Sequence, residues 1–240
     1  LVDDNIARFR GTLVQLSDSD GNTLRTKFLD YNTSDSVAVF YKGASLKDKD
    51  GQIIESKDGT YDSKSKIFTF KGDVNMYTDS VFIRTSSLRF LSASNEAQFD
   101  SDIDFWREKN MLSARRGWYR RDSETFFFRD NVHATSENQE AWSDTLFFYK
   151  QTNNVLMLGD AQLQDSSRHV VAFADQIYYE DSLSQVTMVR NAAVAIETAR
   201  GDVADSVFFG ADTLVYRTRL MCDIAQNELS QAEGRLNDFN

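Results

Sequence analysis

The stretch "DTLFFYKQTNNVLMLGDAQL" (residues 144–163) contains two apolar runs joined by the polar segment "KQTNN" (150–154). The polar segment has the composition of a turn, and each apolar run has the length of a strand. The stretch therefore predicts a β-hairpin. In its first strand Leu146 and Phe148 share one face, while Phe147 and Tyr149 share the other, because side chains alternate along a strand.

The same pattern recurs along the chain. An aromatic residue ends an apolar run at seven places, with spacings of 30, 29, 29, 29, 31 and 37 residues: Tyr31, Tyr61, Phe90, Tyr119, Phe148, Tyr179 and Tyr216. A large apolar residue stands nine positions after each of the first six: Phe40, Phe70, Phe99, Phe128, Met157 and Met188. The hairpin is thus one copy of a repeat of about 29 residues, which indicates a stacked architecture.

Three smaller features accompany each repeat. An apolar residue lies two positions before the aromatic one, except in "DGTY" (58–61) and "RGWY" (116–119), where glycine replaces it. A phrase rich in glycine, aspartate or asparagine follows, as in "FKGDVNM", "FRDNVHA" and "LGDAQL". Polar clusters such as "DSDGN" (18–22), "KDKDG" (47–51) and "DSKSK" (62–66) supply turns. Since 29 extended residues would span about 95 Å, each repeat must fold back into two or three short strands.

We therefore predict an all-β fold, a repetitive β-jelly roll or solenoid-like stack of short strands in two splayed sheets. Residues 1–218 are expected to form a single domain of about seven repeats. Residues 219–240 are expected to be helical or disordered, because Leu220, Ile224 and Leu236 fall loosely on one helical face. The insertion "IETARGDVADS" (196–206) predicts a long loop or a change in the stack.

Composition excludes several classes of function. The net charge of −10 argues against binding to nucleic acid and to anionic membrane surfaces. The single cysteine allows no internal disulfide, and no apolar run reaches the roughly 18–20 residues that span a bilayer. His133 and His169 lack neighbours at metal-ligand spacing, and no catalytic or phosphate-binding motif is present. We expect no enzyme activity, no cofactor and no metal site.

Several copies in register resemble a known family. They include "GQIIESKDGTYDSKSKIFTFKGDVNMYTDSVFIRTSSLRF" (51–90), "WSDTLFFYKQTNNVLMLGDAQL" (142–163) and "FADQIYYEDSLSQVTMVRNAAV" (173–194). Over residues 11–218 the chain resembles the OstA/LptA-like lipopolysaccharide-transport proteins of Gram-negative envelopes. The resemblance implies a periplasmic β-jelly roll that holds acyl chains in an interior groove and joins other transport proteins through its edge strands. Since the chain begins at Leu1, we expect a signal peptide or membrane anchor to be missing from it.

Two sets of residues are candidate sites. Ten apolar residues of the repeat are expected to line a lipid groove, or alternatively to form a closed core: Phe70, Leu88, Phe90, Phe99, Phe128, Leu146, Phe148, Met157, Ile177 and Tyr179. The segment "ARRGWYRR" (114–121) places four arginines around Trp118 and Tyr119: Arg115, Arg116, Arg120 and Arg121. They could contact lipid phosphates, or lie on a solvated strand face and pair with neighbouring acids.

Two functions follow from these expectations. The first is a non-catalytic periplasmic protein that binds lipopolysaccharide and bridges towards the outer membrane, with head-to-tail homo-oligomers as one form of the bridge. The second is a structural β-solenoid adaptor that binds other envelope proteins through its sheet edges without lipid. A splayed interior favours the first function, and a closed one favours the second.

Overall fold

The structure, a computed structural model, describes residues 5–200, 203–218 and 221–237. These residues form 18 strands in one sheet, a single 3₁₀ turn and one helix. The strands are β1 (Ile6–Ser17), β2 (Thr23–Asn32), β3 (Val37–Phe40), β4 (Ala44–Lys47), β5 (Ile53–Ser56), β6 (Asp58–Asp62), β7 (Ile67–Tyr77), β8 (Phe82–Leu91), β9 (Glu96–Phe99), β10 (Ile103–Arg107), β11 (Asn110–Ala114), β12 (Arg116–Arg120), β13 (Thr125–Thr135), β14 (Gln139–Tyr149), β15 (Asn154–Asp165), β16 (Val170–Glu180), β17 (Gln185–Arg200) and β18 (Val203–Arg217). The prediction of an all-β fold is confirmed.

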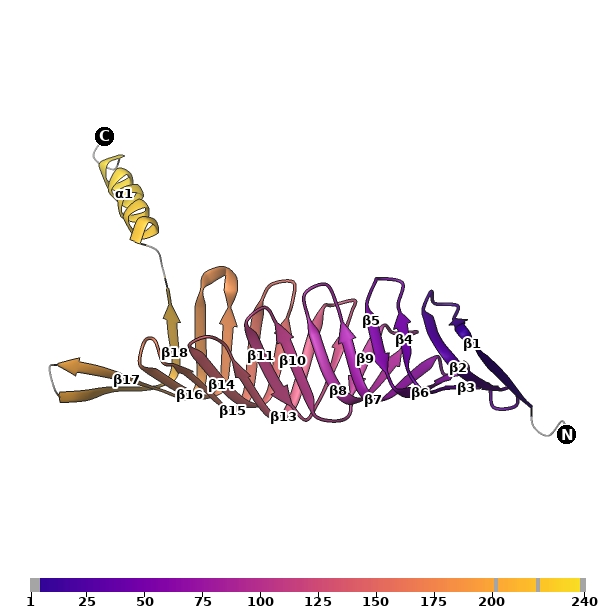
Figure 1. The fold of residues 1–240 in the computed structure, drawn as a ribbon. Helices are drawn as coiled ribbons and strands as arrows, with labels where there is room; N and C mark the ends of the chain where they lie inside the picture. Colours follow the sequence, from indigo (N-terminus) through magenta and orange to yellow (C-terminus); the bar gives the residue numbers. More distant parts are fainter. Residues whose placement is uncertain (1–4, 201–202, 219–220, 238–240) are drawn as a thin grey trace.

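The hairpin predicted from residues 144–163 is formed by β14 and β15. Tyr149 pairs with Asn154 across the turn, and Leu146 pairs with Met157. The same antiparallel pairing continues from strand to strand along the chain, so that the molecule is a long stack with the N-terminus at one end and the C-terminus at the other (Figure 1). The repeat in the sequence is therefore a repeat in space.

The recurring glycine, aspartate and asparagine phrase forms a corner of the sheet. Two consecutive residues with positive φ stand there in four long strands: Gly72 and Asp73, Asp130 and Asn131, Gly159 and Asp160, and Arg190 and Asn191. The strand pairing shifts register at the same points, as a β-bulge requires. Each corner folds the sheet over, and the two predicted sheets are consequently two layers of one continuous sheet.

Small buried residues line the inside of the corner. They stand five positions before the aromatic of each repeat, and the six of them are Thr26, Ser56, Thr85, Ala114, Ser143 and Ala174. The hydroxyl of Thr26 donates to the carbonyl of Gly43 at 2.8 Å, and that of Ser143 donates to the carbonyl of Thr145 at 3.0 Å. These bonds satisfy carbonyl groups that the bend removes from the strand ladder.

Turns at the two ends of the folded strands define two rows. We call the turns at the free edge of the first layer the A turns: residues 18–22, 48–52, 78–81, 108–109, 136–138 and 166–169. We call those at the free edge of the second layer the B turns: residues 33–36, 63–66, 92–95, 121–124, 150–153 and 181–184. The edge at which A and B turns face each other, opposite the corner, is the rim.

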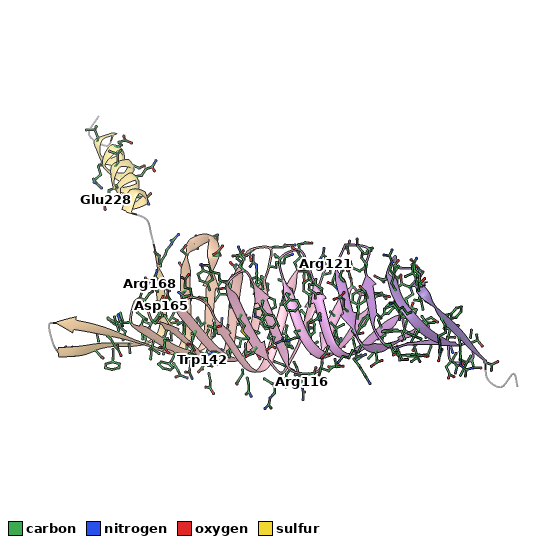
Figure 2. All side chains as sticks on the ribbon, in the orientation of Figure 1. Arg116, Arg121, Trp142, Asp165, Arg168 and Glu228 are labelled. Carbon is green, nitrogen blue, oxygen red and sulfur yellow. The ribbon has the colours of Figure 1, made fainter. Side chains whose placement is uncertain are left out.

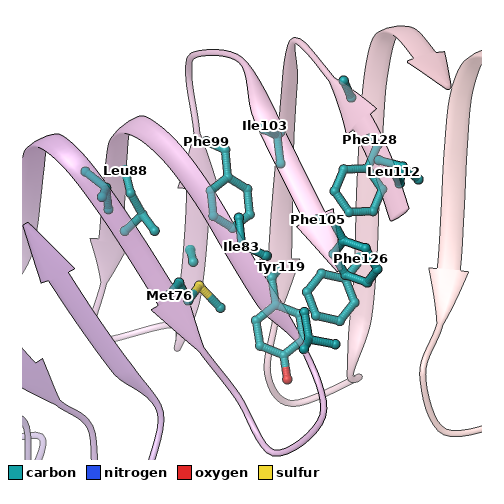
Figure 3. Packing of buried hydrophobic residues seen from close by; sticks show 14 of the residues in the cluster. Met76, Ile83, Leu88, Phe99, Ile103, Phe105, Leu112, Tyr119, Phe126 and Phe128 are labelled. Atoms are coloured by element: carbon teal, nitrogen blue, oxygen red, sulfur yellow. The ribbon is translucent and has the colours of Figure 1, made fainter. Parts of the chain in front are cut away.

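The hydrophobic core lies between the two layers. Phe105 of the first layer packs edge-on against Phe126 and Phe128 of the second, with ring centroids 5.3 Å apart in both pairs. Figure 3 shows these three rings beside Tyr119, which stacks on Phe126 at 4.1 Å. Burial of each such ring contributes about 1.5–3 kcal/mol, so the aromatic columns are the main source of stability.

The C-terminal segments complete the fold. Of the two alternatives for residues 196–206, the long loop is wrong, since β17 and β18 stay paired from Ile196 and Val207 out to Arg200 and Val203, and the change in the stack is what the structure has. The insertion instead lengthens this hairpin, which projects beyond the stack in Figure 1. The expected helix forms as α1 (Met221–Asn237). Among the described residues, no helix has the length and apolar character that crossing a membrane requires.

Candidate functional site: the interior between two layers

The apolar residues that recur at the spacing of the repeat lie on the inner faces of both layers. The ten residues predicted to line a groove all point inwards, and eight of them are at most 5% exposed: Phe70, Leu88, Phe90, Phe99, Phe128, Leu146, Met157 and Ile177. Phe148 and Tyr179 are only partly buried. Phe147, on the outer face, instead contacts Trp118 and Phe127, with ring centroids 6.4 and 4.9 Å apart. The predicted alternation between Phe147 and Phe148 therefore holds in the structure.

Burial near the rim changes along the stack. In the N-terminal repeats the rim-side aromatics Phe68, Phe90 and Tyr119 are at most 1% exposed. In the C-terminal repeats the corresponding positions are partly buried, and the last one, Tyr216, is 49% exposed. The first layer follows the same trend: Leu24, Leu46, Ile54 and Ile83 are fully buried, whereas Ala141, Leu163 and Val194 are partly buried. The interior is closed in the repeats that follow β2 and accessible at the C-terminal end. At the N-terminal end β1 is open too, since Phe9, opposite Leu29, is 47% exposed and Tyr31 is partly buried.

The closed part of the rim is held by polar contacts between A and B turns. Asp20 accepts hydrogen bonds from Lys66 at 2.9 Å and from Ser92 at 3.0 Å. The hydrogen bond from Lys66, followed by that from Ser92, lowers the pKa of the Asp20 carboxyl below its ordinary value. Asp50 accepts from the Asn95 amide at 3.1 Å, and its backbone carbonyl accepts from Arg121 at 3.4 Å.

A third acid continues this row. Asp79 lies 3.9 Å from Arg121 and 3.6 Å from Lys150, both of which are in B turns. Sequence reasoning placed these acids in ordinary turns and missed their role. A signal was available, because Asp20, Asp50 and Asp79 are spaced by 30 and 29 residues, which is the period of the aromatic residues. We call Asp20, Asp50 and Asp79, with Lys66, Ser92, Asn95, Arg121 and Lys150, the rim latch.

The four predicted phosphate-binding arginines do not form one cluster. Arg121 lies at the rim and Arg116 at the opposite edge, beside the corner (Figure 2). Arg115 and Arg116 line a shallow depression of about 660 Å³ together with Arg129, Asp130, Asn131, Asp144 and Thr145. Arg120 pairs with Glu96 at 2.7 Å and covers the ring of Trp118 at 4.3 Å. Pairing with neighbouring acids, the alternative interpretation, thus describes Arg116, Arg120 and Arg121.

The two ends of the sheet carry unpaired strand edges. Within the described chain β1 pairs only with β2, and β18 pairs only with β17. Both end strands expose apolar residues, with Phe9 47% and Phe209 49% accessible. No group of three or more His, Cys, Asp or Glu residues in the described part of the chain is arranged to hold a metal ion.

Comparison with known proteins identifies the family. Residues 4–86 match the model of the OstA-like protein family, and residues 53–182 match the model described as LptA/(LptD N-terminal domain) LPS transport protein. A search of curated proteins finds no match. Among solved structures, LptH, described as the LptA homologous periplasmic component of the lipopolysaccharide transport device from Pseudomonas aeruginosa, is 12% identical. The match covers 66% of this chain and 95% of that one, and its TM-score of 0.28 is too low to equate positions.

The second family model spans more than half of the 240 residues, over the strands that form the closed interior and the beginning of its accessible part. The chain belongs to the LptA/(LptD N-terminal domain) family of lipopolysaccharide-transport proteins.

Proposed function

We propose that this protein acts in lipopolysaccharide transport in the periplasm, without catalysis, by holding acyl chains between its two layers. Family membership supports the transport role. The observation that carries the lipid-binding part is the apolar inner face at the C-terminal end, where Phe148, Tyr179 and Leu214 are only partly buried. A soluble protein gains stability by covering such a surface, and an acyl chain covers it at about 0.8 kcal/mol for each buried CH₂ group.

The ten predicted groove residues have two different roles in this proposal. Phe148 and Tyr179, together with the exposed Phe209 and Tyr216 on β18, form the part of the interior that an acyl chain meets first. The eight deeply buried residues pack against each other and contact lipid only if the layers separate. Met157 and Met188 border both regions, and their flexible side chains suit a wall that adapts to different chains.

The head group of a bound lipid would remain in water at the rim. On the opposite side the strands run through the corner from one layer to the other, so the head group has no exit there. Of the four arginines, Arg121 lies at the rim and Arg116 lies at the corner. We therefore assign a phosphate contact to Arg121 in preference to Arg115 and Arg116. Its guanidinium can pair with a phosphate in two parallel hydrogen bonds.

The edge strands supply the contacts with protein partners. β1 and β18 each leave one row of backbone donors and acceptors unpaired within the described chain. A strand of another transport protein, or of a second copy of this chain, can extend the sheet there and cover Phe9 or Phe209. End-to-end association of this kind would join the two interiors into one path.

Photo-crosslinking tests the lipid path. A benzoylphenylalanine at Phe148 should capture purified lipopolysaccharide, while one at Phe147, the adjacent residue on the outer face, should not. The two positions are matched in strand, depth and residue type, so that only the direction of the side chain differs. Equal capture at both positions, or capture at neither, would contradict an interior path.

The alternative is an adaptor that binds proteins through its edges and holds no lipid. It is favoured by the closed packing of Phe70, Phe90 and Phe128, each at most 1% exposed. The adaptor predicts concentration-dependent association in sedimentation experiments with no capture of lipid at Phe148. The lipid carrier predicts capture whether or not the chains associate.

A further inference from the structure

The rim latch follows the repeat and then stops. Its three acids stand in the first three A turns, at a period of 30 and 29 residues, and each contacts B turns of the facing layer. Within the described residues the later A turns, 108–109, 136–138 and 166–169, form no ion pair or side-chain hydrogen bond with a B turn; their one contact with a ring of the second layer is that of Arg168 with Tyr216, at 6.0 Å. They bond along their own row instead, as Lys109 does with Glu137 at 3.3 Å and Ser166 does with the carbonyl of Asn138 at 3.1 Å.

The end of the latch coincides with the change in burial. Under the latch, the rim-side ring of Phe90 is 1% exposed, and that of Tyr119 is 1% exposed. At the last latch position, beside Lys150, Phe148 is already partly buried, and beyond the latch Tyr179 is partly buried and Tyr216 is 49% exposed. Two independent features, polar contacts at the surface and burial of the inner face, therefore mark the same boundary between closed and accessible interior.

We propose that the rim latch is a lateral gate for the lipid path. Acyl chains enter through the unlatched rim, which starts at the A turn 108–109, and reach the N-terminal repeats only when the latch opens. This inference rests on the proposed function, namely that the interior holds acyl chains. It adds a place of entry and a set of residues that controls how far the chains advance.

The latch is built so that it can open. Three buried polar atoms of the A turns, Asp48 Oδ2, Gln52 Oε1 and Thr78 Oγ1, have no hydrogen-bond partner among the described residues while the rim is shut. Separation of the layers would hydrate them, which offsets part of the cost of breaking the latch. The ion pairs themselves are partly exposed, since the Asp79 side chain is 69% accessible.

The exposure of apolar side chains to water opposes the opening of the latch. Opening the rim without lipid would bring the inner rings of the N-terminal repeats into contact with water, at about 25 cal/mol for each Å². An advancing acyl chain removes that cost, because it covers the separated faces itself. The gate is therefore shut in the empty protein and opens progressively as chains move in from the unlatched end.

Distances across the rim test the closed state. In a cysteine-free C222S background, one pair of spin labels is attached at Lys49 and Ser94, beside the latch, and another at Asn138 and Ser182, beyond it. Electron–electron double resonance should give a narrow distance distribution for the first pair and a broad one for the second. The double change Asp50→Ala and Asp79→Ala, which removes the latch acids and leaves the phosphate contact Arg121 in place, should broaden the first distribution. Arg120→Gln should not, because Arg120 pairs with Glu96 within its own layer.

Capture of purified lipopolysaccharide tests the entry point. Photo-crosslinkers at Tyr179 and at Phe90 report on the unlatched and latched interior. Capture at Tyr179 should be several-fold faster in the unaltered protein, and the double change at Asp50 and Asp79 should reduce this difference. Equal rates in the unaltered protein, or equally narrow distance distributions for both label pairs, would overturn the gate.

The two proposals fail in different ways. Absence of capture at Phe148 and Tyr179 would remove the lipid path, whatever the distances across the rim. Capture at Tyr179 and Phe90 at the same rate would leave the lipid path in place and remove only the gate. If the Phe90 variant does not fold, the distance measurement still tests the gate, because the spin-labelled proteins keep all core residues unchanged.

Discussion

At the scale of single residues, the two glycines that interrupt the repeat have a steric cause. Gly59 and Gly117 stand where other repeats place Leu29, Leu88 or Leu146. A Cβ at Gly59 would lie 2.2 Å from the carbonyl oxygen of Thr69 and 2.4 Å from Cζ of Phe40. The large ring of the neighbouring repeat fills the space, so a side chain at residue 59 would overpack the core.

The change Gly59→Ala should accordingly destabilise the protein by about 3 kcal/mol, at the upper end of overpacking costs, because the backbone oxygen cannot move aside. Urea denaturation followed by circular dichroism measures the loss. Gly234→Ala is the control, since a Cβ there meets no atom within 4 Å and alanine favours the helix. If both variants unfold at the same urea concentration, the steric explanation is wrong.

At the scale of elements, four of the long strands, β7, β13, β15 and β17, bend where two consecutive residues adopt positive φ. Glycine occupies the first of these positions at Gly72 and Gly159, but Arg190 occupies it in β17, with φ of 61°. A residue with a Cβ pays about 1–2 kcal/mol for this conformation, and arginine has no side-chain hydrogen bond to its own backbone that would reduce the cost. The corner of β17 is therefore the most strained of the four.

We expect Arg190→Gly to raise the stability of the protein by about 1 kcal/mol, because glycine relieves the strain. The ion pair that is lost, Arg190 with Asp175 at 3.7 Å, is exposed and contributes little. At the corner of β15 the opposite effect is expected: Gly159→Ala should lower stability, since the Cβ of the alanine would lie 2.5 Å from a carboxylate oxygen of Asp144. Thermal unfolding measures both, and a lower melting temperature for Arg190→Gly would contradict the account.

At the scale of the whole molecule, the stack is cooperative only between neighbours. Each repeat contacts the next one, so the stability of a repeat depends on its own burial and on two interfaces. The repeats of β7, β8 and β13 have fully buried rings under the rim latch, whereas those of β16, β17 and β18 have partly exposed inner residues, and β18 pairs with one strand only. The strands β16, β17 and β18 should therefore open before the strands β7, β8 and β13.

Hydrogen exchange provides the measurement. Backbone amides of β16, β17 and β18 should exchange faster than those of β7, β8 and β13, and addition of purified lipopolysaccharide should slow the exchange in the C-terminal strands first. A uniform exchange rate along the stack would show instead that the protein unfolds as one unit. Slower exchange at the N-terminal strands alone would place the lipid at the wrong end.

The sequence by itself determined the repeat, the all-β architecture and the inward direction of Phe148 against Phe147. These features depend on alternation and spacing along the chain, which local physical chemistry fixes. For residues 219–240 the sequence left a helix or disorder open, and the structure has the helix α1 there. For residues 196–206 the sequence left a long loop or a change in the stack open, and the loop is wrong because the same polar composition also suits the extension of a hairpin. The division into a domain of residues 1–218 and a separate terminal segment stays a prediction.

Only the tertiary structure decided where the interior is closed. Asp20 and Lys66 are 46 residues apart, and Asp79 and Lys150 are 71 apart, so their pairing depends on how the two layers fold towards each other at the corner. Arg116 and Arg121 are separated by the length of the extended strand β12, so that one lies beside the corner and the other at the rim. The angle between the layers is set by packing summed over many repeats, and no single stretch of the chain specifies it.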